Sequence, residues 1–224
     1  MIRRLFTDIA SIYDRMNHVL SLGFDRRWRK LAVAEVEGRP ERVLDLACGT
    51  GDMAFALARR FPDAEILGVD LTPAMLDIAR AKSKLPKIRF VEGDALNLSS
   101  LVSGATFALC TCAFGFRNFP DRPKALREVW NVLTPKGELL VLEFFKPRNF
   151  LLGLFTSIWL RILAAAFAPG RTSSYRYLRE SMQGMVSEDA FVALAKEEGF
   201  KLLRRRFFLP CCTCLHFIQD SAPH

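Results

Sequence analysis

Glycine and proline are not enriched in this sequence of 224 residues, which contains 13 Gly and 11 Pro. These near-average numbers exclude a collagen-like chain and a low-complexity polymer. The sequence also has no visible internal repeat and no Gly/Ser-rich linker. Half of its residues are apolar, which excludes a disordered chain because their burial offsets the entropy of ordering. We therefore expect a single domain over residues 1–224.

A secretion signal is also missing, and the cysteines do not form the pattern of a disulfide framework. The first residues, MIRRLFTD, contain no apolar stretch followed by a small-residue cleavage site. The cysteines lie inside apolar, strand-like runs, and a chain of this length needs no disulfide staples. We expect buried, inert thiols in a reducing, cytoplasmic setting. The six cysteines are Cys48, Cys110, Cys112, Cys211, Cys212 and Cys214.

No metal site is expected, although three side chains of the ligand type follow one another near the C-terminus. Cys212, Cys214 and His216 share one face of an extended strand. Zinc sites instead favour C-x₂₋₄-C spacing on tight turns. Cys110 and Cys112 belong to a strand that we do not expect beside the last one, so they add no ligands.

Basic residues outnumber acidic ones, 32 to 24, which gives a formal net charge of +8. No nucleic-acid motif accompanies them, so nucleic acid is not an expected partner and nucleic-acid methylation is a minor alternative. Attraction to an anionic membrane is one interpretation of the charge, and a basic soluble surface is the other. The basic clusters are Arg26-Arg27, Arg29-Lys30 and Arg204-Arg205-Arg206.

One apolar run tests whether the chain crosses a membrane. Residues 150–168 carry a single charge, Arg161. A spanning helix would place Arg161 near the bilayer centre at a cost of about 2.5–3.5 kcal/mol. A helix that covers an apolar pocket, or lies on a membrane surface, is therefore favoured over a span. We expect a cytoplasmic protein with peripheral association at the inner face of the membrane.

Strands and helices alternate along most of the chain. Because the expected strands are continuously apolar, we predict an α/β fold with a mostly parallel seven-stranded sheet covered on both faces. The last two strands, joined through Pro210, form an antiparallel hairpin at one edge. Segments 1–40 and 147–186 are expected to be helical covers over the carboxyl ends of the strands. The expected strands are 41–46, 65–70, 87–94, 105–114, 138–144, 201–209 and 213–218, and the expected helices are 51–61, 73–82, 123–133 and 187–199.

Punctuating residues support several of these boundaries. Thr72 is the expected N-cap of the second of these helices, with Pro73 at its first position. Ser187 is the expected cap of the last helix, and Gly199 follows its end. The third helix is expected to end before the turn residues 134–137.

The strongest local signal is the run VLDLACGTGD over residues 43–52, an apolar strand followed by a small-residue loop and a helix. Small residues let a ligand approach the backbone, and the helix start offers free N–H groups. The Gly49 to Ala54 spacing also matches a dinucleotide loop. Asp45 argues against that alternative, because it favours a cationic ligand over a pyrophosphate.

Two further acids follow the next two strands. Asp70 ends the second strand about 20 residues after the glycines, where an acid binds ribose hydroxyls. Asp94, beside Ala95, could accept a hydrogen bond from the exocyclic amine of adenine. Three acids around the loop suit S-adenosylmethionine, which carries a sulfonium and an ammonium group. The alternative for a single such Asp is a turn former or helix cap.

Several longer motifs, taken together, indicate a protein family. The chain resembles the ubiquinone/menaquinone biosynthesis C-methyltransferases from about residue 6 to residue 200. The glycine loop is shared by many class I methyltransferases, whereas the YDxMN, FGxRN and YxYLxxS elements are more specific to this family. The motifs are FTDIASIYDRMN (6–17), LDLACGTGD (44–52), FGFRNF (114–119), LTPKG (133–137), LEF (142–144) and YRYLRES (175–181).

The resemblance implies a Rossmann-like class I methyltransferase fold and S-adenosylmethionine as cofactor. It also implies methylation of a ring carbon of a polyprenylated quinol, with demethylmenaquinol favoured over the ubiquinone precursor. Position 113 is often Ser in the family and is Ala113 here, so one cofactor hydrogen bond is expected to be missing. The cofactor residues carried over, with Asp45 from the loop argument, are Asp45, Gly49, Thr50, Gly51, Asp70, Leu71, Asp94, Ala95 and Ala113.

The expected chemistry follows from the quinol. A ring carbon becomes nucleophilic when a neighbouring hydroxyl ionises, so a cation near that hydroxyl assists the reaction. We predict Arg117 on the phenolate side and Asn118 as a hydrogen-bond partner of a ring oxygen. Tyr13 and Asp14 are expected to close over the pocket. The alternatives are a salt bridge from Arg117 to Asp121 and a packing role for Tyr13.

The C-terminal part departs from the family pattern. Cys212 stands where Gly is common, and Phe217 where a His would fall. These changes, with Ala113, favour a second hypothesis, a methyltransferase for another aromatic or lipid acceptor. A dehydrogenase is third, because no Tyr-x-x-x-Lys catalytic pair is visible. A non-catalytic scaffold in a quinone-synthesis complex is a further alternative, and a homodimer stays open.

Overall fold

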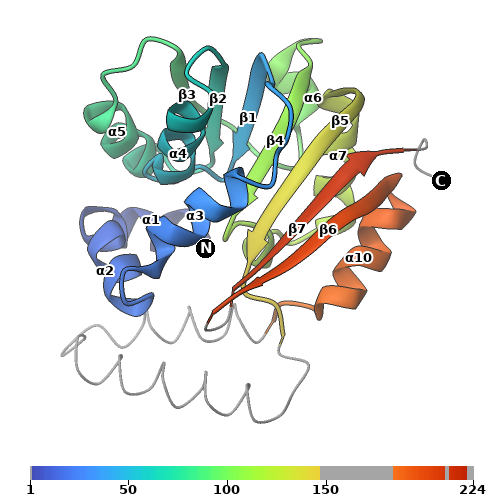
Figure 1. Ribbon diagram of the computed structural model, residues 1–224. Helices are drawn as coiled ribbons and strands as arrows, with labels where there is room; N and C mark the ends of the chain where they lie inside the picture. Colours follow the sequence, from blue (N-terminus) through green and yellow to red (C-terminus); the bar gives the residue numbers. More distant parts are fainter. Residues whose placement is uncertain (1, 147–183, 210–211, 221–224) are drawn as a thin grey trace.

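The computed structural model describes residues 2–146, 184–209 and 212–220. A seven-stranded sheet in the order β3-β2-β1-β4-β5-β7-β6 forms its centre (Figure 1). The first five strands are parallel, and β7 is antiparallel to both β5 and β6. The predicted fold class is confirmed. The strands are β1 (Arg42–Leu46), β2 (Glu65–Asp70), β3 (Ile88–Glu92), β4 (Phe107–Ala113), β5 (Leu133–Glu143), β6 (Phe200–Phe208) and β7 (Cys212–Gln219).

Helices cover both faces of the sheet, as the continuous apolar strands predict. One face packs on α3, α4 and α5 through buried side chains such as Trp28, Leu57 and Leu76. The other face packs on α7 and α10 through side chains such as Leu126 and Phe191. These helices are α3 (Phe24–Val33), α4 (Asp52–Arg60), α5 (Pro73–Lys82), α7 (Arg122–Val132) and α10 (Glu188–Glu197).

The first part of the N-terminal segment is helical and lies at the carboxyl ends of β1 and β2 (Figure 1). It comprises α1 (Ile2–Ile9), the 3₁₀ turn η1 (Ala10–Ile12) and α2 (Tyr13–Leu20) before α3. The prediction that all of residues 1–40 cover the strand ends is corrected, because α3 packs on a face of the sheet. Ile9, Ala10 and Met16 are buried against Met75 of α5. We call residues 2–20 the N-terminal cover. Of the second predicted cover, residues 147–183 lie outside the described part of the chain, and so does the apolar run 150–168.

Two local predictions are corrected by the structure. A short helix, α6 (Leu98–Val102), follows Asn97 where none was predicted. Strand β5 begins directly at Leu133, so residues 134–137 lie inside the strand rather than in a turn before it. The pairing with β4 shifts there, and Lys136 has a φ of 65°. The turn residues therefore produce a bulge instead of ending the element.

The strand order separates the cysteines of β4 from those of β7. Strand β5 separates β4 from β7, so Cys110 and Cys112 do not neighbour the last strand, as predicted. Every cysteine in the described ranges is a buried free thiol. Burial raises the pKa of Cys214 to about 12 and raises the pKa of Cys110 further still. These thiols stay protonated near neutral pH and are poor nucleophiles.

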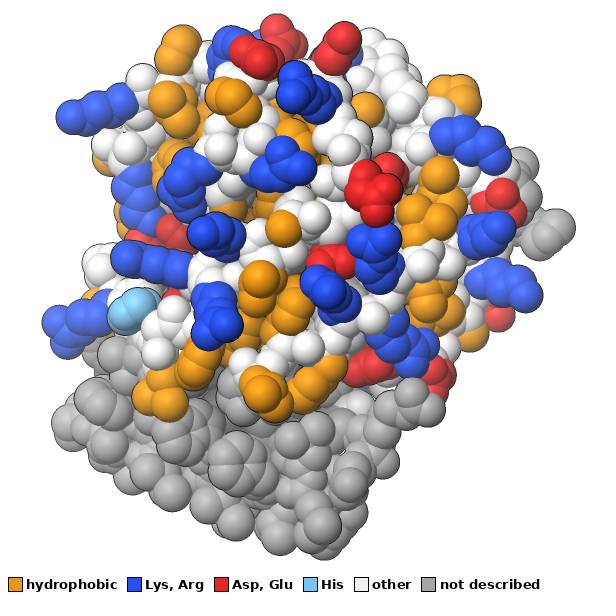
Figure 2. All heavy atoms as spheres, in the orientation of Figure 1, with side chains coloured by type: hydrophobic (Ala, Val, Ile, Leu, Met, Phe, Trp, Pro, Cys, Tyr) orange, Lys and Arg blue, Asp and Glu red, His pale blue; other side chains and the backbone are white. Residues whose placement is uncertain are grey.

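Lys and Arg side chains are dispersed over the face of the molecule that Figure 2 presents, with acidic side chains between them. Arg204 and Arg206 of β6, for example, both pair with the buried carboxylate of Glu35, at 3.3 and 2.6 Å. Part of the excess positive charge therefore supports the fold. In residues 2–146, 184–209 and 212–220, no helix combines the length and apolar character needed to cross a membrane.

Candidate active site

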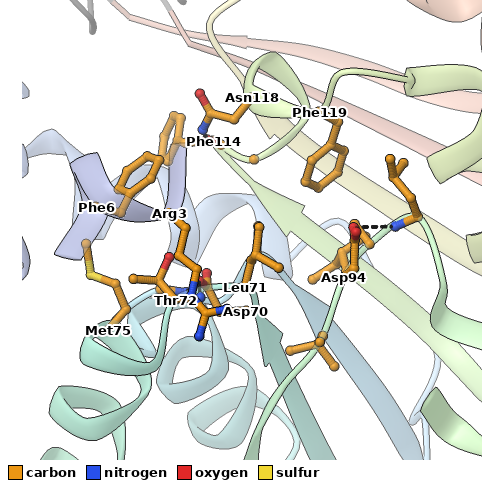
Figure 3. A pocket seen from close by; sticks show the side chains of 18 of the residues that line it. Arg3, Phe6, Asp70, Leu71, Thr72, Met75, Asp94, Phe114, Asn118 and Phe119 are labelled. Atoms are coloured by element: carbon orange, nitrogen blue, oxygen red, sulfur yellow. Dashed lines mark hydrogen bonds between the residues drawn. The ribbon is translucent and has the colours of Figure 1, made fainter. Parts of the chain in front are cut away.

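A cavity of about 370 Å³ lies at the carboxyl ends of the parallel strands. The strand order reverses between β1 and β4, and ligands of open α/β sheets bind at such a switch point. Asp70 is the last residue of β2 and Asp94 follows the neighbouring strand β3, whereas Phe114 and Asn118 follow β4 (Figure 3). The wall includes Arg3, Phe6, Tyr13, Gly49, Asp70, Leu71, Asp94, Ala95, Ala113, Phe114 and Asn118.

The glycine loop turns sharply between β1 and α4. Gly49 and Gly51 have φ values of 55° and 88°, in the left-handed region that favours glycine. Gly49 lines the cavity, so its bare backbone is accessible to a ligand. Gly51 does not line it. A Cβ there would lie 2.9 Å from Phe90 Cζ, so a glycine is also needed for packing at the start of α4. Contact of Gly51 with the cofactor stays a prediction.

Asp70 is the acid that the structure fixes most firmly in the wall. Its carboxylate accepts hydrogen bonds from the backbone N–H groups of Gly49 and Thr72, both at 2.9 Å. Burial raises the pKa of Asp70 above its usual value, although these hydrogen bonds oppose the rise. Asp70 thus connects the glycine loop to the start of α5, and Leu71 extends the wall beside it.

Asp94 and Ala95 line the cavity beyond Asp70. One oxygen of Asp94 accepts a hydrogen bond from the Leu96 N–H at 2.9 Å (Figure 3). Asp94 is therefore a turn former, as its alternative reading proposed, and a wall residue as well. Ala113 also lines the cavity, without the hydroxyl that a Ser would bring.

Asp45 and Thr50 do not line this cavity, and their contact with the cofactor stays a prediction. Asp45 is fully buried and accepts a hydrogen bond from Thr111 Oγ1 at 2.8 Å on the adjacent strand β4. Burial raises the pKa of Asp45 to about 7. Thr50 is also buried, and its hydroxyl donates to Asp14.

The raised pKa of Asp45 predicts a pH-dependent stability. The folded pKa of about 7 exceeds the usual value of 3.8, so the folded state holds the proton more tightly than the unfolded state. Its stabilising effect is full below pH 4 and is lost as the pH rises through about 7. Asp45→Asn should therefore gain up to about 4 kcal/mol of unfolding free energy over wild type between pH 4 and 8. Urea unfolding across that range measures the difference, and a constant difference would contradict the assignment.

Arg117 forms a buried ion pair, and it is not the bridge to Asp121 that was the alternative. Its guanidinium pairs with Glu143 at 2.6 Å rather than with Asp121, and the two side chains are 6% and 1% exposed. Asp121 instead caps α7 by accepting from the Lys124 N–H. Arg117 does not line the cavity. Its predicted position on the phenolate side of the substrate stays a prediction.

Aromatic rings connect this buried pair to the cavity. The Arg117 guanidinium lies 5.7 Å from the ring centre of Phe114, which is part of the wall. Phe114 stacks on Phe144 at 4.8 Å and has a φ of 61°, a strained value for a bulky residue. On the N-terminal side, the Arg29 guanidinium lies 5.4 Å from the same Phe114 ring. The guanidinium groups of Arg117 and Arg29 therefore both pack near Phe114, a residue of the cavity wall.

Two predicted substrate residues do reach the cavity. Asn118 lies in its wall, in the 3₁₀ turn η2 (Phe116–Asn118) that follows β4. Tyr13 lines it from the N-terminal cover and meets Phe6 edge to face, with ring centres 6.0 Å apart. Tyr13 is therefore packed and exposed to the cavity at once, so both interpretations of this residue stand.

Arg3, Phe6 and Met75 line the cavity but were not predicted as site residues from the sequence. Glu143 was given no role there either. Phe6 and Glu143 lie in motifs already singled out, FTDIASIYDRMN and LEF, which was the signal available. Arg3 and Met75 carried no such signal, because an exposed basic residue and a helical methionine are common features of ordinary surfaces and cores.

These features define a class of protein. A parallel sheet with an antiparallel edge hairpin, a glycine loop after β1 and acids after β2 and β3 are the marks of a class I S-adenosylmethionine-dependent methyltransferase. A solved structure of the plantazolicin methyltransferase BpumL has the same fold, with a TM-score of 0.68 over 96% of this chain and 90% of that one, at 14% identity.

The sequence comparisons narrow the class to one family. The ubiE/COQ5 methyltransferase family matches residues 1–219, and the chain belongs to it. A demethylmenaquinone methyltransferase of Deinococcus radiodurans is 44% identical, covering 89% of this chain and 85% of the relative. One of Thermus thermophilus is also 44% identical, covering 88% and 92%. The predicted family and enzyme class are confirmed: the chain is an S-adenosylmethionine-dependent methyltransferase.

Proposed function

We propose that this enzyme methylates a ring carbon of demethylmenaquinol, the reduced form of demethylmenaquinone. The observation that carries the proposal is the likeness to relatives of that name over nearly their whole length. The wall of the cavity supports it, because several of its side chains are aromatic. Phe6, Phe114 and Phe119 suit a flat apolar ring better than a charged acceptor.

The residues present fit S-adenosylmethionine. When bound, this cofactor supplies an electrophilic methyl group. Asp70 would bind the ribose hydroxyls, since its carboxylate lines the cavity while the Gly49 and Thr72 N–H groups hold it in place. Asp94 and Ala95 would hold the adenine, and the bare backbone of Gly49 leaves room for the methionine part.

On the quinol side, residues of the cavity wall would contact the ring, and the buried ion pair of Arg117 and Glu143 would hold them in position. Asn118 would hydrogen-bond a ring oxygen, and Phe114 would set the plane of the ring. Arg117 is then a positioning residue: Glu143 accepts from its guanidinium at 2.6 Å and from its backbone N–H at 3.3 Å. These bonds fix the turn that carries Asn118. Alignment of ring carbon and methyl group supplies much of the acceleration.

The overall reaction balances without a further reactant. Methyl transfer would form a bond between the ring carbon and the methyl carbon and break the bond from methyl to sulfur. The ring carbon would then lose its proton to water and the aromatic ring would be restored, with one proton released for each methyl group transferred. Ionisation of the neighbouring hydroxyl raises the electron density at that carbon. A site lined by aromatic rings limits access of water, which would otherwise solvate the phenolate and make it less reactive.

Peripheral membrane association is part of the proposal. The prenylated substrate resides in a membrane, the chain has a net charge of +8, and residues 150–168 form an apolar run with one charge. A segment of this kind beside basic groups suits the surface of an anionic bilayer. Sedimentation with anionic and with neutral vesicles measures the association, and equal recovery from both would remove the charge argument.

The experiment that tests the function is methyl transfer from labelled S-adenosylmethionine into two reduced acceptors, demethylmenaquinol and the benzoquinol precursor of ubiquinone. We expect label in the naphthoquinone product at a rate at least tenfold above the benzoquinone product. Binding of the cofactor without label in either product would reject the quinol and favour another aromatic or lipid acceptor, the hypothesis that Ala113 and Cys212 raise.

A further inference from the structure

The N-terminal cover forms one side of the cofactor cavity and packs on α5 through apolar side chains. Phe6 and Tyr13 of the cover line the cavity. A hydrophobic cluster joins the cover to α5 in the described structure: Ile9, Ala10, Met16 and Met75, with partly buried Phe6, Ile12, Tyr13, Ala74 and Ile78 packed against them. Apolar contacts of this kind are non-directional, so they do not by themselves fix where the Tyr13 ring lies. Polar contacts at the edges of the cover supply that direction.

One residue of the cover makes two such contacts. Asp14 accepts a hydrogen bond from the Thr50 hydroxyl with one carboxylate oxygen and pairs with the Lys82 ammonium through the other. Lys82 also donates to the Thr50 carbonyl at 3.2 Å and lies 3.5 Å from Asp52 Oδ1. The cover, the glycine loop, the start of α4 and the end of α5 are thus joined at one point. We call Asp14, Thr50 and Lys82 the clasp.

The position of the clasp relates it to the cofactor. Tyr13 directly precedes Asp14, and its ring lies 3.8 Å from where a Cβ on Gly49 would be. Thr50 directly follows Gly49, the loop residue whose backbone faces the cavity. The clasp therefore fixes a cover ring against the loop that would hold the methionine part of the cofactor. A second tie, Arg3 to Glu92 at 2.7 Å, joins α1 to the end of β3.

From this geometry we infer that the clasp holds the N-terminal cover closed over the bound cofactor and sets how fast the cofactor product leaves. The inference rests on S-adenosylmethionine as the cofactor and needs no assumption about the acceptor. Asp14 is a positioning residue in this account, because it acts through Tyr13 and Thr50 and does not line the cavity. Opening requires the Asp14 contacts to break and Tyr13 to move away from Gly49.

The buried partner gives the clasp most of its effect. Thr50 is 3% exposed, so without Asp14 its hydroxyl loses a partner in a place that water reaches poorly. The Lys82 and Asp14 side chains are 32% and 40% exposed, so their mutual attraction is screened by solvent. Asp14→Asn keeps an acceptor for Thr50 and loses the ion pair, and it should have a smaller effect than Asp14→Ala.

The test is the release rate of S-adenosylhomocysteine, the cofactor product, measured by stopped-flow competition with no acceptor present. We expect Asp14→Ala to raise the rate roughly 10- to 50-fold, Asp14→Asn to raise it a few-fold, and the turnover number at saturating cofactor to change less than twofold. Asp77→Ala is the matched control, since Asp77 is an exposed α5 acid paired only locally with Arg80. Its release rate should equal that of wild type.

Each outcome decides the matter. Unchanged release in folded Asp14→Ala, checked by its melting temperature and by Asp14→Asn, would overturn the clasp while leaving the methyltransferase assignment intact. A turnover number that falls as much as release rises would assign Asp14 to the reaction instead. Failure of wild type to bind the cofactor product would overturn both the clasp and the cofactor assignment. Failure to methylate a quinol would not affect release at all.

Discussion

Replacing Arg117 by alanine should lower turnover by roughly 100-fold or more and leave the dissociation constant for S-adenosylmethionine within about twofold. The reason is spatial. Arg117 does not line the cavity, but its pair with Glu143 fixes the turn that presents Asn118 and the ring of Phe114. The acids that would hold the cofactor, Asp70 and Asp94, belong to other strands and keep their contacts.

A control separates this effect from loss of folding. Arg117→Ala leaves the Glu143 carboxylate buried without its cation, and breaking a buried pair costs about 3–5 kcal/mol. The double variant Arg117→Ala with Glu143→Gln removes that stranded charge and should recover much of the stability. It should not recover turnover. Steady-state kinetics and calorimetric cofactor titration on both variants make the comparison, and wild-type turnover in either would remove Arg117 from the mechanism.

Replacing Asp70 by alanine should raise the dissociation constant for S-adenosylmethionine about 100-fold. Two hydrogen bonds from ribose hydroxyls to the carboxylate would be lost, each contributing about 1.5 kcal/mol or more. The Gly49 and Thr72 N–H groups would also lose their acceptor, so the glycine loop would loosen. At saturating cofactor, turnover should fall less than tenfold, because the residues on the acceptor side are unchanged.

Two comparisons make the Asp70 result specific. Asp63→Ala removes a negative charge from a 98% exposed side chain in the turn before β2, and should leave cofactor affinity unchanged. Asp70→Asn keeps the size of the side chain but places an amide NH₂ against a backbone N–H, so affinity should fall nearly as far as in Asp70→Ala. Equal affinity in Asp70→Ala and wild type, by titration calorimetry, would place the ribose elsewhere in the cavity.

Elements with strong local signals were predicted closely from the sequence. The apolar run EILGVD forms β2 over the predicted residues 65–70, and α5 begins at Pro73 after Thr72 and ends at Lys82 as predicted. Ser187 caps α10 by accepting from the Ala190 N–H. In contrast, α6 has five residues and no apolar periodicity long enough to detect. Such short helices depend on tertiary contacts rather than on their own sequence.

The site could be predicted in part for the same reason. Gly49, Asp70 and Asp94 each follow a clear strand, so the sequence places them at the same edge of the sheet, and all three line the cavity. The partner of Arg117 was not predictable, because Glu143 is 26 residues away and lies at the end of the adjacent strand β5. Neither the spacing of these two residues nor their types distinguish that pair from a local bridge to Asp121.

Asp45 shows a further limit of sequence reasoning. Its position before the glycine loop suggested a ligand contact, and only the structure reveals that the side chain faces Thr111 inside the sheet. An acid at a strand end and an acid one position from the loop look alike in sequence. Whether such a side chain faces the ligand or the adjacent strand depends on how β1 pairs with β4. In this structure Asp45 lies opposite Thr111.

The central claim is transfer of a methyl group to a ring carbon of demethylmenaquinol. Mass spectrometry and carbon NMR of the product made with S-adenosylmethionine carrying a ¹³C-labelled methyl group test it most directly. We predict one labelled methyl on the naphthoquinone ring, with the shift of a carbon-bound methyl group and with both quinone oxygens free. A label on oxygen, or a purified enzyme that binds the cofactor and leaves the quinol unlabelled, would contradict the account.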